Sequence, residues 1–260
     1  MDYVCLLFTA SFLSAFLSGL FGMGGGLVMV PILAKAFQLS GVDDSICMHV
    51  AMGTSLGVIA PTSILSFIEH KRHGTVDMRI FKSWIIVLPV SSLITSILTT
   101  RLDNNLLKIG FSVFCCFIGF LMIFKNYLVF KYDFPDNYLK YVWGIIIGIF
   151  SGAMGVGGGI LSAIIMLLCG RSINQATAIS AGVSLLITIP GLFVRIYSGW
   201  GELEQNPMSL GYVDVLTVLT ILPISFIVSP ISTKISYMME KRHLEFGFSL
   251  VMFFVAFSFI

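Results

Sequence analysis

The sequence SGLFGMGGG at residues 18–26 returns as SGAMGVGGG at residues 151–159, and both copies lie inside long apolar runs. Glycine is the least favourable ordinary residue in a helix interior, at about 1 kcal/mol relative to alanine. Five glycines within eight residues therefore break the helix in both places. A broken backbone inside a membrane is tolerated only where protein buries it or where it lines a cavity. Paired breaks at matching places of two halves thus indicate the binding site of a transporter.

The composition supports a membrane setting. The chain has 260 residues, of which 57% are apolar and 11% charged, and its mean hydropathy is +0.98. Soluble domains carry about 25% charged residues. Apolar stretches of about 18 residues or more recur along the chain, which predicts an all-α polytopic membrane protein. A net charge of +2 without any basic block gives no sign of nucleic-acid binding, and five cysteines without a C-x-x-C motif predict neither a metal site nor a disulfide framework.

The two halves share further landmarks in the same order. The sequence GTSL at residues 53–56 corresponds to GVSL at residues 182–185, and Pro61 corresponds to Pro190. The later matches are G-x-V-D at 74–77 and 211–214, Pro89 and Pro223, and GFS at 110–112 and 247–249. We therefore predict a first transmembrane repeat at residues 1–130, a cytoplasmic link at 131–140 and a second repeat at 141–260.

The charges of equivalent loops predict that the repeats are inverted. Lysine and arginine concentrate in cytoplasmic loops. The loop after the second apolar segment carries Lys71, Arg72 and Arg79, whereas its counterpart carries Glu202, Glu204 and Asp214. The next loop carries Arg101 and Asp103, whereas its counterpart carries Lys234, Lys241 and Arg242. Because the bias reverses, each half must cross the membrane an odd number of times.

An odd number of crossings requires the first segment of each half to return to the side from which it entered. As one helix, the roughly 35 residues of segment 3–37 would extend about 50 Å, which exceeds the roughly 30 Å hydrocarbon core. Each repeat is therefore expected to be a Gly-broken helical hairpin followed by three transmembrane helices. Both termini are expected outside and the central link inside.

The hairpin tips are candidate anion sites. A new helix is expected to start near Gly26 and near Gly159, where the first amide N–H groups have no intrahelical partner and the helix dipole favours negative charge. The candidate substrate-binding glycines are Gly22, Gly24, Gly25, Gly26, Gly155, Gly157, Gly158 and Gly159. The alternative is that these glycines only let helices pack closely, since Gly22 and Gly26 also fit a G-x-x-x-G pattern.

Four stretches carry a family resemblance: GMGGGLVMVP at 22–31, AMGTSL at 51–56, PTS at 61–63 and HKRHGTVD at 70–77. Together they resemble the sulfite exporter TauE/SafE family of membrane permeases. The resemblance implies transport of a small sulfur-containing anion, such as sulfite, sulfoacetate or thiosulfate, across the bacterial cytoplasmic (inner) membrane. The second half departs from the first, because Ile164 stands at the position of Pro31 and Val183 at that of Thr54. One hairpin is therefore expected to contribute less to the site.

Hydroxyl side chains in the matched segments are further candidates. We expect Thr54, Ser55 and Ser184 to complete the hydrogen bonds of the anion, although each hydroxyl can instead bond back to a carbonyl of its own helix. Thr62, Ser63 and Thr188 are expected to serve packing or backbone hydrogen bonding near the prolines.

Two basic residues lie within apolar segments. Arg195 is a candidate substrate or gating residue, because an intramembrane charge is by default functional, or else it extends to the outer interface. His49 is a candidate for proton coupling, because histidine titrates near neutral pH, or else it is an interfacial histidine. Asp77 and Asp214 are expected to cap helix N-termini.

These features favour a secondary transporter without a cofactor, driven by gradients, and they allow a homo-oligomer. Two alternatives stay open. A passive anion channel would use the same polar groups, and only its flux would differ. A membrane-embedded enzyme would need a Ser/His or Cys/Cys pair on facing helices, for which His49 is available but no C-x-x-C motif accompanies it.

Overall fold

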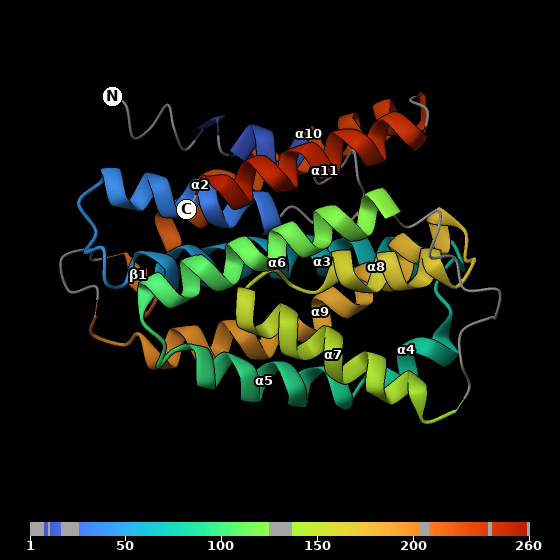
Figure 1. The fold of residues 1–260 in the computed structure, drawn as a ribbon, viewed down its shortest axis with the longest axis horizontal. Coiled ribbons are helices and arrows are strands. Elements are labelled where there is room, and N and C mark those ends of the chain that lie inside the picture. Colours follow the sequence, from blue (N-terminus) through green and yellow to red (C-terminus); the bar gives the residue numbers. More distant parts are fainter. Residues whose placement is uncertain are drawn as a thin grey trace.

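The computed structural model describes residues 8, 9, 11–16, 26–124, 137–202, 208–238 and 241–258, which are almost entirely helical (Figure 1). The helices of the first half are α2 (Gly26–Leu39), α3 (Cys47–Arg72), α4 (Met78–Trp84), α5 (Val87–Thr99) and α6 (Asn104–Phe124). The second half contains α7 (Leu139–Met154), α8 (Gly159–Leu168), α9 (Ile173–Ser198), α10 (Val215–Met238) and α11 (Lys241–Phe257). Two short strands, β1 (Ser209–Leu210) and β2 (Val213–Asp214), pair antiparallel before α10. The all-α prediction is confirmed.

Helices α3 and α9, which carry the matched GTSL and GVSL sequences, pack against each other in the middle of the bundle. The short helix α2 packs on α3, and the short helix α8 packs on α9. In Figure 1, α2 runs from the middle of the molecule toward one end, whereas α8 runs from the middle toward the opposite end. The halves also interlock, because α5 packs on α7 and α6 packs on α11.

The second Gly stretch breaks the helix as predicted. Helix α7 ends at Met154, and Gly155 caps it in the left-handed conformation with φ +65°. Gly157 and Gly158 follow with φ +75° and +74°, before α8 starts at Gly159. An L-residue pays roughly 1–2 kcal/mol in this conformation, so the turn depends on glycine. Of the first stretch, Gly22, Gly24 and Gly25 lie outside the described residues, and Gly26 is the first described residue of α2.

The expected apolar segment at residues 80–100 is a bent pair of helices and not one continuous helix. Helices α4 and α5 meet at an angle of 42°. The break at Ile85 and Ile86 lies three to four residues before Pro89. Proline has no N–H to bond the carbonyl four residues earlier, and its ring displaces that carbonyl. Pro89 thus explains the bend, although α5 continues through it.

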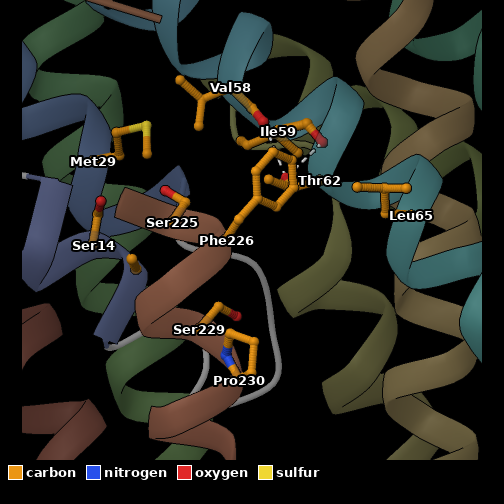
Figure 2. A pocket seen from close by; sticks show the side chains of 11 residues that line it. Ser14, Met29, Val58, Ile59, Thr62, Leu65, Ser225, Phe226, Ser229 and Pro230 are labelled. Carbon is orange, nitrogen blue, oxygen red and sulfur yellow. Dashed lines mark hydrogen bonds between the residues drawn. The ribbon is translucent and has the colours of Figure 1, made fainter. Parts of the chain in front are cut away.

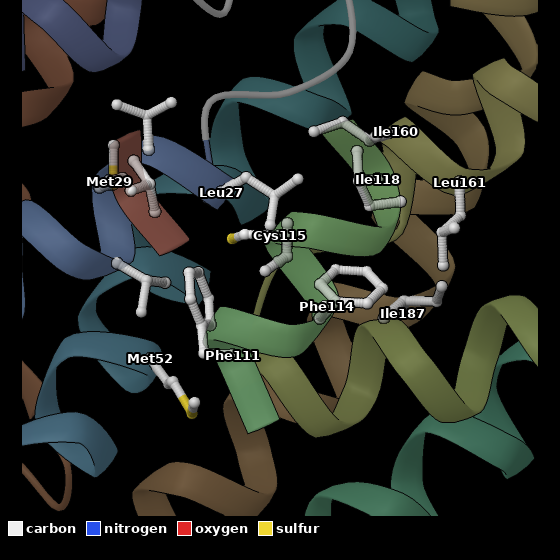
Figure 3. Close-up of a cluster of buried hydrophobic side chains, with 14 of the residues drawn as sticks. Leu27, Met29, Met52, Phe111, Phe114, Cys115, Ile118, Ile160, Leu161 and Ile187 are labelled. Carbon is white, nitrogen blue, oxygen red and sulfur yellow. The ribbon is translucent and has the colours of Figure 1, made fainter. Parts of the chain in front are cut away.

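Four described helices are long and apolar enough to cross a membrane, namely α3, α6, α9 and the first 18 residues of α10, and the α4–α5 pair makes a fifth span. Large apolar side chains such as Ile86, Phe193 and Phe254 are exposed on the outside of the bundle, as expected for a lipid-facing surface. A buried apolar cluster fills the interior. Figure 3 shows Leu27 of α2 and Ile160 of α8 close to α6. The first turns of both short helices are therefore held inside the protein.

The matched aspartates cap helices, as predicted. Asp77 accepts a hydrogen bond from the Arg79 amide at 3.0 Å at the start of α4. Asp214 accepts one from the Thr217 amide at 3.2 Å at the start of α10. Both aspartates therefore have a structural role that requires no part in transport.

Candidate functional site

Gly26, the last residue of the first Gly stretch, lies against the second Gly stretch inside the bundle. A Cβ atom placed on Gly26, the first residue of α2, would lie 3.0 Å from the carbonyl oxygen of Val156 in the second stretch. The same atom would lie 2.8 Å from Cδ1 of Ile59 on α3. A Cβ atom on Gly157 would lie 3.0 Å from Cγ2 of Ile59. Any side chain at Gly26 or Gly157 would therefore fill the junction between the two breaks.

One face of α3 and one face of α9 line this junction. On α3, Ser55 lies one turn before Ile59, and on α9 Ser184 lies one turn before Thr188. A Cβ atom on Gly157 would lie 3.0 Å from Thr188 Oγ1. Ile59 of α3 and Thr188 of α9 occupy matched positions of the two halves, and both side chains lie at the junction.

Two of these hydroxyls are buried without a partner. Thr188 is fully buried, and so is Ser55. Neither hydroxyl oxygen has a hydrogen-bond partner within the part of the chain that the structure describes. A buried polar group without a partner costs about 1–3 kcal/mol. Hydroxyls kept unpaired beside a glycine turn are suited to bind a polar solute.

Backbone donors lie at the same place. Helix α8 begins at Gly159, and the first intrahelical hydrogen bond is from the Ser162 amide to the Gly158 carbonyl at 3.2 Å. The amides of residues 159–161 therefore have no partner within the helix, and the dipole of α8 adds partial positive charge there. The residues at the start of α8 are buried. This helix start favours an anion over a cation.

Arg195 supplies a buried positive charge close to the junction. Its side chain is fully buried, which rules out the expected alternative of a side chain that extends to the interface. Its Nη2 donates to Thr99 Oγ1 at 3.3 Å and to Met52 Sδ at 3.4 Å, while Nε has no partner. Among the described residues, no carboxylate lies within ion-pair distance of this guanidinium.

One side chain separates Arg195 from the second Gly stretch. Met52 accepts from Arg195 on one side, and on the other side its Cβ would lie 2.7 Å from a Cβ atom on Gly155. On α9, Arg195 lies two turns after Thr188, on the same face. The unpaired hydroxyls, the glycine turn and the guanidinium therefore form one continuous seam, which we call the α3–α9 seam.

His49 completes the polar cluster at Arg195. The side chain is buried, and its Nδ1 lies 2.7 Å from Arg195 Nη1. Its Nε2 lies 3.1 Å from the carbonyl oxygen of Leu102. Because a guanidinium can only donate, Nδ1 accepts, and Nε2 donates to the carbonyl. His49 is thus a neutral imidazole with a fixed tautomer, and its side chain is buried.

The turn between β1 and β2 closes this end of the seam. The Tyr212 ring stacks on His49 with centroids 5.2 Å apart, and the Tyr212 amide donates to the Arg195 carbonyl at 3.2 Å. Close approach depends on Gly53 of α3, because a Cβ atom there would collide with the Tyr212 carbonyl oxygen. Burial, and then the charge of Glu202, raise the pKa of Tyr212 above its ordinary value, so its hydroxyl stays neutral.

A cavity of about 160 Å³ lies on the other side of Ile59 (Figure 2). It lies between α2, α3 and α10, and none of its lining residues is charged. Its hydroxyl groups come from Ser14, Thr62, Ser225 and Ser229. Because Ile59 contacts both Gly26 and Gly157 and also lines this cavity, its side chain separates the cavity from the junction.

Comparison with known proteins identifies the family of this chain. The family model described as Sulfite exporter TauE/SafE matches residues 7–259. The chain belongs to the TauE/SafE family. A probable membrane transporter protein of Haemophilus influenzae is 34% identical over 97% of this chain and 96% of its own length. One of Methanocaldococcus jannaschii is 28% identical over 95% of this chain and 91% of its own. This TauE/SafE member is a multi-pass membrane protein of a transporter family.

The structure gives Thr54 a structural role besides the predicted one. Its Oγ1 accepts a hydrogen bond from the Asp214 amide at 3.1 Å, so it anchors the β1–β2 turn of this TauE/SafE protein. We expect Thr54→Val to lower the free energy of unfolding by about 1–3 kcal/mol, because it leaves that buried amide without a partner. Anion affinity should be unchanged. Thermal unfolding and anion titration of the purified variant measure the two effects separately.

Thr188 differs from the two other hydroxyls that were expected to serve packing or backbone hydrogen bonding near the prolines. Thr62 and Ser63 do bond back to their own helix, at 3.0 Å to the carbonyls of Ile59 and Ala60, as expected near Pro61. Thr188 lacks such a bond although it lies near Pro190. The sequence did offer one indication of a site role for Thr188. It lies one helical turn after the candidate Ser184, and therefore on the same face of the helix.

Proposed function

We propose that this protein is a secondary transporter for a small anion, with the binding site at the junction of the two Gly stretches. A sulfur-containing oxyanion such as sulfite, sulfoacetate or thiosulfate fits best, because the model that matches the chain describes a sulfite exporter. The amides at the start of α8 and the hydroxyls of Ser55 and Thr188 would bind the oxygen atoms. Arg195 would supply the charge, and the bacterial cytoplasmic membrane would supply the gradients.

The observation that carries this proposal is the composition of the α3–α9 seam. It combines a glycine turn at Gly157, the unpaired hydroxyls of Ser55 and Thr188, and the guanidinium of Arg195, all buried. A buried cation without a carboxylate partner is costly, and a bound anion removes that cost. Glycines that only allowed helix packing would need no such unpaired donors.

We also propose that the two repeats are inverted, with Gly-broken hairpins that enter from opposite faces. Helices α2 and α8 run in opposite directions from the middle of the molecule, which supports this topology (Figure 1). In this arrangement the Tyr212 turn closes the seam at one end, and Ile59 separates it from the cavity. Transport would then require these two barriers to open alternately.

The Thr188 hydroxyl provides a test with opposite signs for binding and stability. We expect Thr188→Val to weaken anion binding about threefold to tenfold, because it removes one hydrogen-bond donor worth about 0.5–1.5 kcal/mol. The same change should leave thermal stability unchanged or raise it, because the buried hydroxyl has no hydrogen-bond partner among the described residues. Titration of the purified variant measures the first effect and thermal unfolding the second. Unchanged binding would remove Thr188 from the site.

Flux measurements test the function itself. Purified protein in liposomes should carry radiolabelled sulfite, thiosulfate or sulfoacetate down its gradient with a rate that saturates as the anion concentration rises. A carrier saturates at low turnover, whereas a channel does not. A flux that rises linearly with concentration would replace the carrier by the channel alternative, and protein that carries none of the three anions would contradict the proposal.

A further inference from the structure

The pair formed by His49 and Arg195 has a feature that the binding of an anion alone does not require. Arg195 Nη1 donates to the imidazole of His49 at 2.7 Å, although the same donor would bind an anion more strongly. The other contacts of the guanidinium are a threonine hydroxyl and a thioether sulfur, which is a weak acceptor. An anion that approaches Arg195 therefore competes directly with His49.

The protonation state of His49 depends on its contact with Arg195. In the pair, Nδ1 must keep its lone pair free to accept from Arg195, and Nε2 donates to the Leu102 carbonyl. A proton on Nδ1 would place an N–H against the N–H of the guanidinium, so two cations would face each other across 2.7 Å. His49 thus takes up a proton only when it separates from Arg195 or when an anion lies between them.

We propose that the Arg195–His49 pair couples the movement of one proton to the movement of the anion. This inference rests on the proposed transport function and names its coupling ion. The anion accepts hydrogen bonds from Nε and Nη1 of Arg195, which releases Nδ1 of His49. A proton from water then binds Nδ1, and the imidazolium donates to the anion. When the anion leaves, His49 releases the proton and returns to Arg195.

The surroundings of His49 allow this cycle. Tyr212 stacks on the ring, and an aromatic face also stabilises an imidazolium, so the ring keeps its partner in both states. Tyr212 is the titratable group on that side, and its hydroxyl remains neutral as argued above. From α9 the ring faces Arg195, and from the α5–α6 link it faces the Leu102 carbonyl. No carboxylate among the described residues forms an ion pair with Arg195. A bound anion would therefore supply the negative charge for both Arg195 and the protonated His49.

Proton movement and anion movement are measured together in liposomes. Thiosulfate and sulfoacetate suit this experiment because both are fully ionised near neutral pH and bring no proton of their own. The liposomes contain a pH-sensitive dye, and valinomycin with potassium clamps the membrane potential. We expect the inward movement of either anion to acidify the lumen, by about one proton per anion, since one histidine titrates. Anion influx without acidification would overturn the coupling while it leaves the transport function standing.

A pair of histidine variants assigns the proton. Glutamine at position 49 can accept from Arg195 and donate to the Leu102 carbonyl, but it does not titrate in this range. We expect His49→Gln to lose the acidification per anion carried, a ratio that does not depend on the rate of influx. His73→Gln is the control, because its side chain is exposed at the end of α3. Acidification per anion in His49→Gln equal to that of wild type would overturn the assignment.

Discussion

Replacement of Gly157 by alanine should reduce anion flux more than tenfold while the protein still folds and inserts. The added Cβ atom would lie 3.0 Å from both Thr188 Oγ1 and Ile59 Cγ2, in the space where we place the anion. Each tenfold decrease in affinity corresponds to a loss of about 1.4 kcal/mol in binding free energy. Flux of labelled sulfite, thiosulfate and sulfoacetate, compared at equal amounts of reconstituted protein, measures the effect.

Gly170→Ala is a matched control for this variant. Gly170 has φ +73°, against +75° for Gly157, so alanine costs about the same backbone strain of roughly 1–2 kcal/mol at both positions. A Cβ atom on Gly170 would meet nothing within 4 Å. Both variants should lose stability through this backbone strain, and Gly157→Ala also through its two close contacts, whereas only Gly157→Ala should lose flux. Equal flux in both variants would show that the glycine turn does not form the site.

The second large effect is expected at Arg195. Arg195→Gln should weaken anion binding about tenfold to a hundredfold, because a charge-assisted hydrogen bond contributes about 1.5–3 kcal/mol. Arg195→Lys should also bind more weakly than wild type, since lysine keeps the charge but loses the planar fork of donors. Titration calorimetry with the purified variants measures both affinities.

Arg101→Lys is the control for the lysine variant, because Arg101 is exposed in the link between α5 and α6. It should bind the anion like wild type. If Arg195→Gln retained wild-type affinity, the guanidinium would have a structural role only, and the site would reduce to the hairpin junction.

Several features of this structure follow from short, local sequence patterns. The glycine cluster at residues 151–159 predicts a helix break because the penalty is local, and the structure has the break there. The aspartates 77 and 214 predict caps for the same reason. The bend before Pro89 was missed because a proline inside an apolar segment is tolerated in some helices and breaks others, depending on the neighbouring helices.

The composition of the site depends on contacts between distant residues, which local patterns do not encode. His49 and Arg195 were each recognised as unusual, but their separation of 146 residues gave no reason to pair them. For the same reason, the hydrogen bonding of Thr54 and Thr188 was not predicted. The Asp214 amide donates a hydrogen bond to the Thr54 hydroxyl, whereas no described group forms a hydrogen bond with the Thr188 hydroxyl. Repeat symmetry was the one long-range signal in the sequence, and it predicted that the two central helices correspond.

The most direct test of the account is an experimental structure with selenite, whose anomalous scattering locates this heavier analogue of sulfite without ambiguity. The account predicts a peak on the α3–α9 seam, beside Gly157 and Thr188 and within hydrogen-bond reach of the first amides of α8. Arg195→Gln crystals should show a weakened peak. A strong peak outside the seam, with none beside Gly157, would contradict the central claim that the meeting point of the two Gly stretches binds the anion.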